Sequence, residues 1–370
     1  EEITTPGEGQ VRALVTLAGN PVLSTPNSEQ LAVALDELDF MVSIDIYLNE
    51  TTRHADVILP PPSQLQRSHY DLLLLQFGVR NVANYSTAVL PMDDGQPDEW
   101  EIISKLTLIA QGHGVDADPS LVDDMAIAAL VRSAVKDEHS NVAGRDPDEL
   151  MIELDAAGRR GPDRMLDFML RTGPFGDGFG VDPDGTSLDD LLAHPHGRDF
   201  GSLASRIPEV LRTPSGKVEL APAVFLGDLD RLAASMPSLI EQPYRLVGRR
   251  HLRSNNSWMH NVEVLVKGAP RCTLHVHPDD ADALGLTDGG AVSIRSRVGT
   301  VTAPVEVTDS IRPGVVSLPH GWGHDLPGAQ LRVAAEHAGV NSNVLADDKA
   351  IDPLSGTSVL NGIPVDLAPA

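Results

Sequence analysis

Short apolar runs alternate with polar, turn-rich segments along the first sixty residues. Residues 11–18 and 39–45 are apolar and predict two buried strands. Residues 28–38 between them predict a helix, for which we expect Ser28 to be the N-cap. Residues 57–59 are a third apolar run, and the prolines behind them cannot continue a strand or a helix. This order predicts part of a parallel α/β sheet, whose strand ends are where nucleotides bind.

The middle of the chain changes to a helical period. We expect helices over residues 99–110, 121–136, 147–156 and 162–171, the first with apolar positions at Trp100, Ile103, Leu106 and Ile109. Residues 173–212 carry few strand or helix signals. Although they are rich in Gly, they have no Lys-Ser/Thr ending and no preceding strand, so we expect a structural loop rather than a phosphate loop. Residues 213–220 predict a turn followed by a strand.

From Tyr244 onward the pattern is one of short β runs. They cover residues 245–248, 273–276, 291–296, 300–307 and 315–318, with a short helix expected over 278–284. Short strands with one interposed helix are typical of a closed β-barrel.

Composition narrows the class of protein. The chain of 370 residues has 28 Lys and Arg against 53 Asp and Glu, a net charge of −25, which disfavours nucleic acid and anionic membrane surfaces as partners. Its one cysteine, Cys272, cannot form an internal disulfide and indicates a reducing compartment, so we expect a cytoplasmic protein. No stretch approaches the ~20 apolar residues of a membrane span, so none is expected.

Donor side chains are concentrated in residues 248–261. This run contains Arg249, Arg250, His251, Arg253, Ser254, Asn255, Asn256, Ser257, Trp258, His260 and Asn261. Arg offers paired donors to phosphate, while Asn and Ser add donors without charge. A polar surface loop with a chance basic cluster is the alternative interpretation.

Two later segments have a similar character. Residues 319–324 follow a predicted strand and combine glycines with His320, Trp322 and His324, and residues 339–345 contain Asn341 and Asn343. The two histidines are four residues apart, but in a Gly-rich loop this spacing does not place them on one face. We therefore expect no metal site there.

Together these segments resemble the molybdenum or tungsten bis-pterin guanine dinucleotide oxidoreductases, which include formate dehydrogenases, periplasmic nitrate reductases and dimethyl sulfoxide reductases. The front half matches at Gly19-Asn20-Pro21 with Ser24 and Thr25, at Asp45 with Thr51, and at residues 55–60. The resemblance implies α/β plus β-barrel architecture. Residues 1–98 would be the second half of a Rossmann-like guanine-dinucleotide-binding domain, 99–240 a helical and irregular connector, and 241–370 a double-psi β-barrel.

The resemblance also implies the cofactor, Mo-bis(molybdopterin guanine dinucleotide) or its tungsten form, and the residues that bind it. Asn20, Ser24, Asp45 and Thr51 would face the guanosine of one dinucleotide. The other implied cofactor-binding residues are Arg249, His251, Ser254, Asn256, Ser257, Trp258, His260, Asn261, His320, Asn341 and Asn343.

A [4Fe-4S] cluster normally needs four thiolates, so we expect the cluster and the metal-ligating residue in an N-terminal half that precedes residue 1. The implied partners are that half, a small-molecule substrate and an electron-transfer subunit. The 43–60 segment favours a formate dehydrogenase-like enzyme. The alternatives are a pterin-free scaffold related to the large subunit of respiratory complex I, and a non-catalytic nucleotide-binding module.

Overall fold

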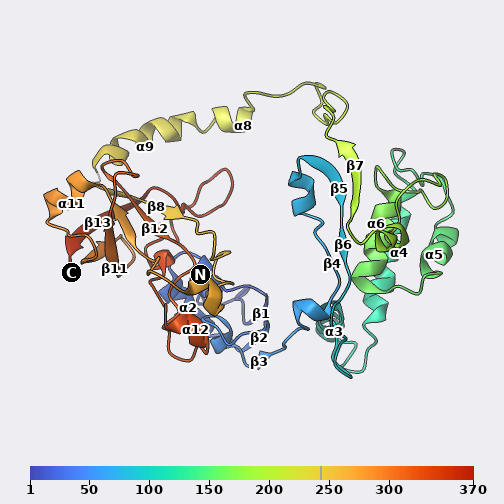
Figure 1. Cartoon of the computed structure of the whole chain (residues 1–370), viewed down its shortest axis with the longest axis horizontal. Helices are drawn as coiled ribbons and strands as arrows, with labels where there is room; N and C mark the ends of the chain where they lie inside the picture. The colour runs from blue at the N-terminus through green and yellow to red at the C-terminus, as the bar shows by residue number, and fades with distance from the viewer. Residues whose placement is uncertain (242–243) are drawn as a thin grey trace. The chain divides into compact units, whose positions relative to one another are not determined.

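A computed structural model describes residues 1–241 and 244–370, which form two compact units (Figure 1). The first unit joins Glu1–Pro60 to Val218–Ala370, and the second is Pro61–Lys217. Residues 242 and 243, inside the predicted domain 241–370, lie outside the described residues. The domain boundaries expected at residues 98 and 240 stay a prediction, because compactness alone does not test them.

The first unit begins with a parallel sheet of strand order β1-β2-β3. The strands are β1 (Ala13–Leu17), β2 (Phe40–Ile44) and β3 (Val57–Ile58), and α1 (Pro21–Ser24) with α2 (Ser28–Leu35) provides the crossover between the first two. A parallel pair needs such a crossover, since a tight hairpin cannot return the chain to the same end. The parallel sheet is therefore confirmed.

The expected N-cap of α2 was wrong by one residue. Asn27 is the N-cap, in the left-handed conformation, and no side chain caps the helix. Ser28 is instead the first helical residue, and its buried hydroxyl accepts a hydrogen bond from the Nδ2 of Asn341 at 3.0 Å. The Ser28 hydroxyl thus bonds to a residue far along the chain instead of capping its own helix.

The C-terminal part of the first unit is a closed barrel in which six of the described strands follow the order β10-β11-β9-β12-β8-β13. The strands are β8 (Tyr244–Arg249), β9 (Leu274–Val276), β10 (Ala291–Arg295), β11 (Thr300–Val307), β12 (Val315–Pro319) and β13 (Ile363–Pro369). The pairs β8/β12 and β9/β11 are parallel and the others antiparallel. The predicted barrel is confirmed, and β13 is an addition that the sequence pattern did not indicate.

Alternating side chains fill the barrel. In β10, Val292 and Ile294 are fully buried while Ala291 and Arg295 face outward, as a period of two requires. Helix α11 (Pro278–Leu284), which was predicted, packs its Ala281 into the same core. Short helices α10 (Glu263–Val266) and α12 (Arg332–Ala335) and the 3₁₀ turns η1 (Thr52–His54) and η4 (Ser342–Val344) lie in the connecting loops.

The strand expected within residues 213–220 was wrong. This segment consists of turns and bends and leads into α8 (Ala223–Leu226) and α9 (Leu229–Glu241). Val218 and Leu220 are largely exposed. Among the described strands none pairs with this segment, and Pro222, which lacks an N–H donor, follows within a few residues, so an extended strand gains nothing.

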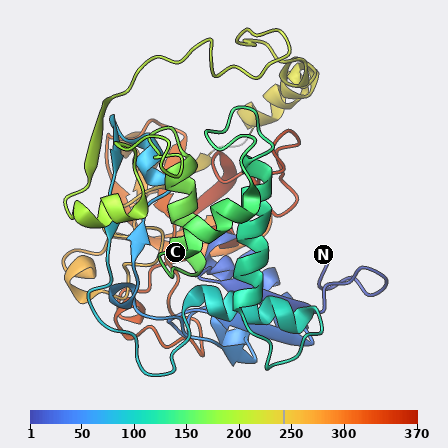
Figure 2. The ribbon, with the colours of Figure 1, turned by 90° about the vertical axis from the view of Figure 1, so that its right-hand side faces the viewer.

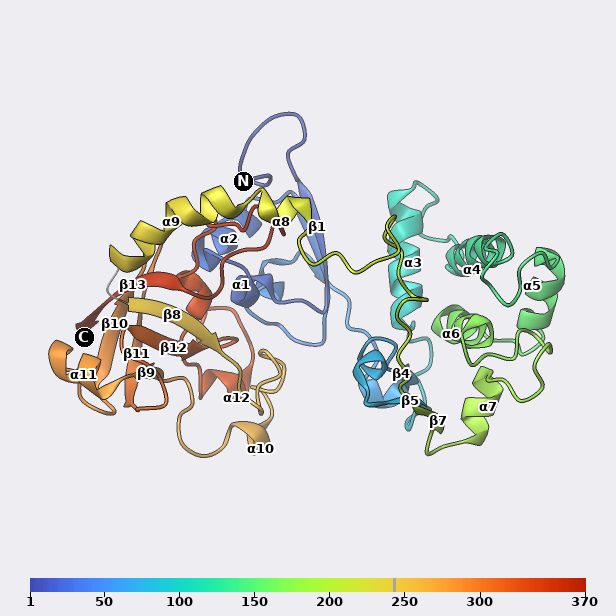
Figure 3. The same ribbon diagram turned by 90° about the horizontal axis from the view of Figure 1, so that it is seen from above.

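The second unit is mainly helical (Figures 2 and 3). Its helices are α3 (Glu99–Ala110), α4 (Ser120–Ala134), α5 (Pro147–Asp155), α6 (Gly161–Thr172) and α7 (Leu188–Ala193), so the four predicted helices are confirmed. Two-stranded ribbons join β4 (His69–Tyr70) to β6 (Tyr85–Ser86) and β5 (Arg80–Ala83) to β7 (Arg198–Ser202), and the 3₁₀ turns are η2 (Gln64–Gln66) and η3 (Leu74–Phe77). Residues 173–212 were expected to be a loop but contain α7 and β7.

A buried cation joins three helices of this unit. Arg164 of α6 is 1% exposed, and its guanidinium contacts Asp123 and Asp124 of α4 at 3.1 and 2.6 Å and Asp155 of α5 at 2.7 Å. Arg164 and Asp123 are both buried, whereas the side chains of Asp124 and Asp155 are partly exposed. Because the Arg164–Asp123 pair lies out of water, each of these two charges stabilises the fold only while its partner is present.

We expect Arg164→Met to lower the free energy of unfolding by about 3–5 kcal/mol, since Asp123 would remain buried without its cation. Thermal unfolding followed by circular dichroism measures this loss. Arg80→Met is the matched control, because Arg80 and Asp199 are half exposed and such pairs contribute about 0–1 kcal/mol. Equal losses in the two variants would contradict the prediction.

Candidate functional site

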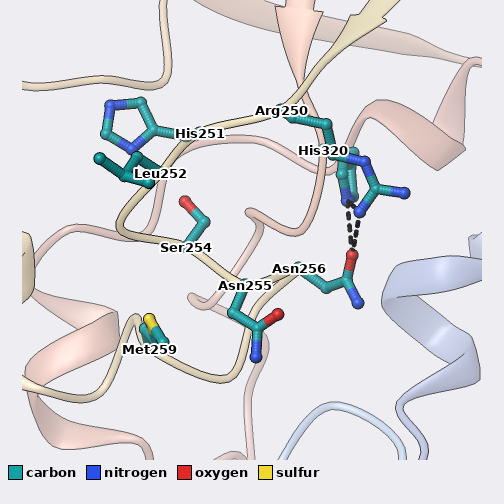
Figure 4. A pocket seen from close by; sticks show the side chains of 8 residues that line it. All are labelled: Arg250, His251, Leu252, Ser254, Asn255, Asn256, Met259 and His320. Carbon is teal, nitrogen blue, oxygen red and sulfur yellow. Dashed lines mark hydrogen bonds between the residues drawn. The ribbon is translucent and has the colours of Figure 1, made fainter. Parts of the chain in front are cut away.

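The loop after β8 and the loop after β12 form one polar cavity. Strands β8 and β12 are parallel neighbours, with Arg249 opposite Pro319, so both loops leave the barrel at the same end. The cavity has a volume of about 470 Å³ (Figure 4). It is lined by Arg250, His251, Leu252, Ser254, Asn255, Asn256, Met259 and His320.

Three of the lining side chains are bonded to one another. The Nη1 of Arg250 donates to the Oδ1 of Asn256, and the Nε2 of His320 lies 3.0 Å from that oxygen and 3.2 Å from the same Nη1 (Figure 4). Burial and the Arg250 charge lower the pKa of His320, so its ring is neutral at pH 7. Arg250 is therefore the cation of this cluster.

Backbone conformation shapes the cavity wall. Asn255 and Asn256 both adopt left-handed φ angles, of 41° and 62°, which Asn tolerates better than most residues. Gly321, with φ of 85°, lies against this bend, and a Cβ at its position would come within 2.3 Å of the Asn256 carbonyl oxygen. Gly321 thus allows the two loops to meet.

The cavity is locally cationic although the chain is acidic. Burial first, and then the charges of Arg271, Arg249 and Arg253, lower the pKa of His251. That shift indicates that several guanidinium charges act on the cavity wall. An anionic ligand would gain from the same charges.

Of the predicted cofactor-binding residues, the structure brings His251, Ser254, Asn256 and His320 together in this cavity. Arg250 and Asn255 lie in the predicted run and also line it. Leu252 and Met259 were missed, because apolar residues give no chemical signal in a sequence. Ser257, and Trp258 with 56% of its surface exposed, belong to the same loop but do not line the cavity.

Arg249 is placed differently from its neighbour Arg250. Its guanidinium donates to the carbonyl oxygens of Ser317 at 2.8 Å and Thr273 at 2.9 Å, and burial lowers its pKa. The side chain therefore joins β8 to β12 and to the segment before β9. A direct contact of Arg249 with a cofactor stays a prediction.

Three predicted asparagines, Asn261 at the end of the 248–261 run and Asn341 and Asn343 farther along the chain, also hold backbone. Asn341 donates to the Val22 carbonyl oxygen at 3.0 Å, and Asn343 to that of Leu23 at 2.7 Å. The Oδ1 of Asn261 accepts from the Val333 and Ala334 amides at the start of α12. Asn341 and Asn343 thus attach the last barrel loop to α1.

In the front half, the predicted residues form a network between the loops that follow β1 and β2. Asn20 donates to Glu50 at 2.7 Å and accepts from the Thr51 hydroxyl at 2.7 Å. Asp45 accepts from the Tyr47 amide at 3.0 Å and from Asn49 at 3.1 Å, and burial raises its pKa. Ser24 is exposed. These four residues do not line the cavity, and their role toward guanosine stays a prediction.

A fully buried polar line extends inward from this network. The Oε1 of Glu50 lies 2.9 Å from the Nδ1 of His324, and the Nε2 of His324 lies 2.8 Å from the Nδ1 of His260. The exposed fractions of these three residues are 0%, 2% and 1%. From sequence, His324 was a donor of the 319–324 segment that we did not expect to bind a metal, and Glu50 gave no signal. Among the described residues no group of His, Cys, Asp and Glu could hold a metal ion.

The far end of this line lacks a partner. His260 stacks on Trp322 with ring centroids 3.9 Å apart, and neither the Nε2 of His260 nor the Nε1 of Trp322 has a hydrogen-bond partner in the described part of the chain. A buried unsatisfied donor or acceptor costs about 1–3 kcal/mol. The Gly321 backbone is the further hydrogen-bonding neighbour of the His260 ring. Burial and the charge of His324 lower the pKa of His260 to about 3.

The fold and the cavity thus define a barrel domain with a cavity whose wall carries many hydrogen-bond donors and the cationic Arg250. Residues 244–364 match the family model described as "Molydopterin dinucleotide binding domain". The chain is 24% identical to the "Assimilatory nitrate reductase catalytic subunit" of Bacillus subtilis (strain 168) over 337 residues, which are 90% of this chain and 41% of that protein.

Two further relatives cover similar shares. The "F420-dependent formate dehydrogenase subunit alpha" of Methanocaldococcus jannaschii is 25% identical over 84% of this chain and 38% of its own length. The "Dimethyl sulfoxide/trimethylamine N-oxide reductase" of Rhodobacter capsulatus is 23% identical over 85% of this chain and 36% of its own length. The chain therefore spans less than half the length of these relatives.

Among solved structures, the acetylene hydratase from Pelobacter acetylenicus superposes with a TM-score of 0.63 at 19% identity, covering 97% of this chain and 44% of that one. This likeness concerns the fold alone. The chain is homologous to the molybdopterin oxidoreductases of the dimethyl sulfoxide reductase and formate dehydrogenase family, and it carries their domain for the bis(molybdopterin guanine dinucleotide) cofactor.

We expect Gly321→Ala to lower the free energy of unfolding more than Gly285→Ala does. Both glycines have left-handed φ angles, but a Cβ at Gly285 meets nothing within 4 Å, whereas at Gly321 it meets the Asn256 carbonyl. Backbone strain alone costs about 1 kcal/mol, and the clash adds at least about 1 kcal/mol more. Urea unfolding of both variants measures the difference, and equal losses would show that the two loops can separate freely.

We expect His260 to make stability depend on pH below about 6.5. Its folded-state pKa lies below its unfolded-state value, so the unfolded chain binds more protons between about pH 3 and 6.5 and stability is lost as the pH falls through that range. The slope is at most about 1.4 kcal/mol per pH unit. Urea unfolding between pH 7 and 5 should show a flatter dependence in His260→Gln, and an unchanged one in His139→Gln, where the side chain is exposed. If the free energy of unfolding depended on pH equally steeply in the wild type and in His260→Gln, the prediction would be wrong.

Proposed function

We propose that the chain is the C-terminal part of a molybdenum or tungsten bis-pterin oxidoreductase, and that the cavity of Arg250, Ser254, Asn255, Asn256 and His320 holds part of a pterin dinucleotide. The observation that carries this proposal is that the Arg250 guanidinium forms no ion pair with a described carboxylate. No carboxylate among the described residues pairs with it, so its charge is available to a phosphate.

The donors in the cavity fit this group chemically. A pterin dinucleotide has phosphate oxygens for a guanidinium and ring edges for amide and hydroxyl groups. When bound, the metal and its dithiolenes supply two-electron redox chemistry. The residues of this chain would bind and orient the cofactor and exclude water from it, which is the protein's usual share in such enzymes. The unpartnered nitrogens of His260 and Trp322 add polar atoms within the same loops.

The finer parts of the proposal rest on the resemblance. The barrel would have double-psi topology, and the three-stranded sheet would be part of a Rossmann-like domain. The [4Fe-4S] cluster and the metal-ligating residue would come from an N-terminal half, and an electron-transfer subunit would complete the enzyme. We place the complete enzyme in the cytoplasm. Among the described residues, no helix is both long and apolar enough to cross a bilayer.

For the substrate we propose formate. A relative named as the alpha subunit of a formate dehydrogenase is among the similar proteins, alongside others named as reductases of nitrate and of dimethyl sulfoxide. The complete enzyme should reduce an artificial dye with formate. Turnover with nitrate or dimethyl sulfoxide and none with formate would replace this substrate while leaving the cofactor proposal intact.

We expect Arg250→Ala to weaken cofactor binding about ten- to hundredfold in the complete enzyme, because a hydrogen bond to a charged group contributes about 1.5–3 kcal/mol. Molybdenum, tungsten and pterin contents of the purified enzyme measure this. Arg312→Ala is the control, since Arg312 is exposed and does not line the cavity. Arg249 and Asn343 are unsuitable targets, because their donors hold backbone carbonyls.

The outcome is interpreted against the wild type. Loss of pterin in Arg250→Ala with retention in Arg312→Ala supports the assigned cavity. Equal pterin contents in both variants would place the binding site elsewhere. A wild-type enzyme that contains neither metal nor pterin would overturn the proposed function and favour a pterin-free scaffold.

A further inference from the structure

The parallel sheet of the first unit ends at β1, on the side away from β2 (Figure 1). Val15 of β1 lies opposite Val42 of β2, and Leu17 lies opposite Ile44. Residues that lie opposite each other in a sheet point to the same face. Val42 and Ile44 are 6% and 1% exposed, whereas Val15 and Leu17 are 56% and 50% exposed. This face is therefore covered over the middle strand and open over β1.

The open region continues at the ends of the neighbouring strands. Phe40 lies opposite Ala13, and Val57 lies opposite Val42, so both point to the same face, and both are exposed. The other face is closed, because Met41 packs there in the core with α1 and α2. A parallel sheet is normally buried on both faces, so the open face of this sheet indicates a missing layer.

The main chain of β1 is open along the same border. The Ala18 amide donates to the Ile44 carbonyl oxygen at 2.9 Å, so this residue faces β2. Successive residues of a strand direct their N–H and C=O groups to opposite sides, so those of Ala13, Val15 and Leu17 face away from β2. Among the described strands only β2 pairs with β1.

Strand β1 also lacks the features that normally protect an exposed edge. Its sequence, Ala-Leu-Val-Thr-Leu, contains no charged residue and no proline, and its pairing with β2 runs without a bulge. An edge strand of this composition is a template for a further strand. The hydrogen-bonding groups and the apolar side chains thus point to the same kind of partner, a strand with an apolar cover.

We propose that the free edge of β1 and the open face beside it are the docking surface for the N-terminal half of the enzyme, which adds a parallel strand next to β1 and a helix over Val15 and Leu17. This inference rests on the proposed function, which requires that half.

Two observations support this occupant. The chain spans 41%, 38% and 36% of three relatives, so most of each relative lies outside the matched part and is long enough to contain such a segment. A parallel strand also needs a crossover connection, which is usually a helix. One segment of the N-terminal half can therefore supply both the strand that pairs with β1 and the helix that covers Val15 and Leu17.

Hydrogen exchange at single-residue resolution tests this docking. In the isolated chain, the Val15 and Leu17 amides should exchange at least about a hundredfold faster than those of Thr16 and Ala18, which face β2. In the complete enzyme all four amides should be protected alike. Val15 and Leu17 amides that exchange as fast in the complete enzyme as in the isolated chain would overturn the proposal.

A substitution tests the cover over the face. In the complete enzyme, Val15→Lys should make the amides of residues 15 and 17 exchange at least about tenfold faster than in the wild type, because an unpaired charge is costly beneath an apolar cover. Val33→Lys is the matched control, since Val33 is a similarly exposed valine on α2. It should leave these amides unchanged, and an equal acceleration in both variants would count against the docking. If one of the proteins does not fold, the other comparison decides alone.

Other occupants of this edge would give different patterns of exchange. Protection of Val15 and Leu17 in the isolated chain at every concentration would place another segment of the same chain on β1. Protection that increases with the concentration of the isolated chain would place a second copy there. Either result would overturn the assignment to the N-terminal half.

Metal and pterin contents separate this inference from the proposed function. A complete enzyme that contains pterin but leaves the Val15 and Leu17 amides unprotected would overturn the docking surface and leave the proposed function intact. A complete enzyme with protected amides and neither metal nor pterin would overturn the proposed function and leave the docking surface intact.

Discussion

The parallel pairing of β8 with β12 is the constraint on which the candidate site depends. These strands are separated by some seventy residues of sequence, yet their register places Arg249 opposite Pro319, so their following loops must leave the barrel together. The Arg249 guanidinium strengthens this pairing through two carbonyl groups. Gly321 then allows the second loop to lie against the left-handed bend at Asn256. Without this register, Arg250 and His320 would lie apart and the cavity would not form.

Several contacts of the N-terminal segment with the C-terminal part of its unit are made by amide, carboxylate and imidazole groups. Asn341, Asn343 and the Glu50–His324 pair bridge sequence separations of about three hundred residues. Polar contacts of this kind are directional, so they fix how the strand-end loops lie against the barrel more strictly than apolar packing would. Many residues with the chemistry of ligands therefore already hold backbone or one another.

The distinction between local sequence patterns and long-range contacts explains which parts of the molecule could be predicted from sequence. Short β runs identified most barrel strands, because a strand rich in β-forming residues leaves a local pattern in the sequence. Strand β7 escaped detection, since it is stabilised by pairing with β5 more than a hundred residues earlier rather than by its own composition. Helix α3 was predicted, but its fully buried apolar residues are Ile102 and Leu108. The predicted set at Trp100, Ile103, Leu106 and Ile109 repeats every three residues, and a helix turns by 3.6, so that set drifts around the axis.

The site residues were harder to predict for a reason of chemistry. A donor that holds a carbonyl and a donor that binds a ligand require the same side chain, so sequence could not separate Arg249 from Arg250. Both arginines nevertheless contribute positive charge in this acidic chain. Hydrogen bonds to carbonyl groups orient the Arg249 guanidinium but do not cancel its net charge. Burial first, then the charge of Arg271 and then that of Arg249, lower the pKa of His251, so Arg249 is one of the charges that act on the cavity wall. Arg249 can therefore attract an anionic cofactor toward Arg250 while its own hydrogen bonds hold the barrel together.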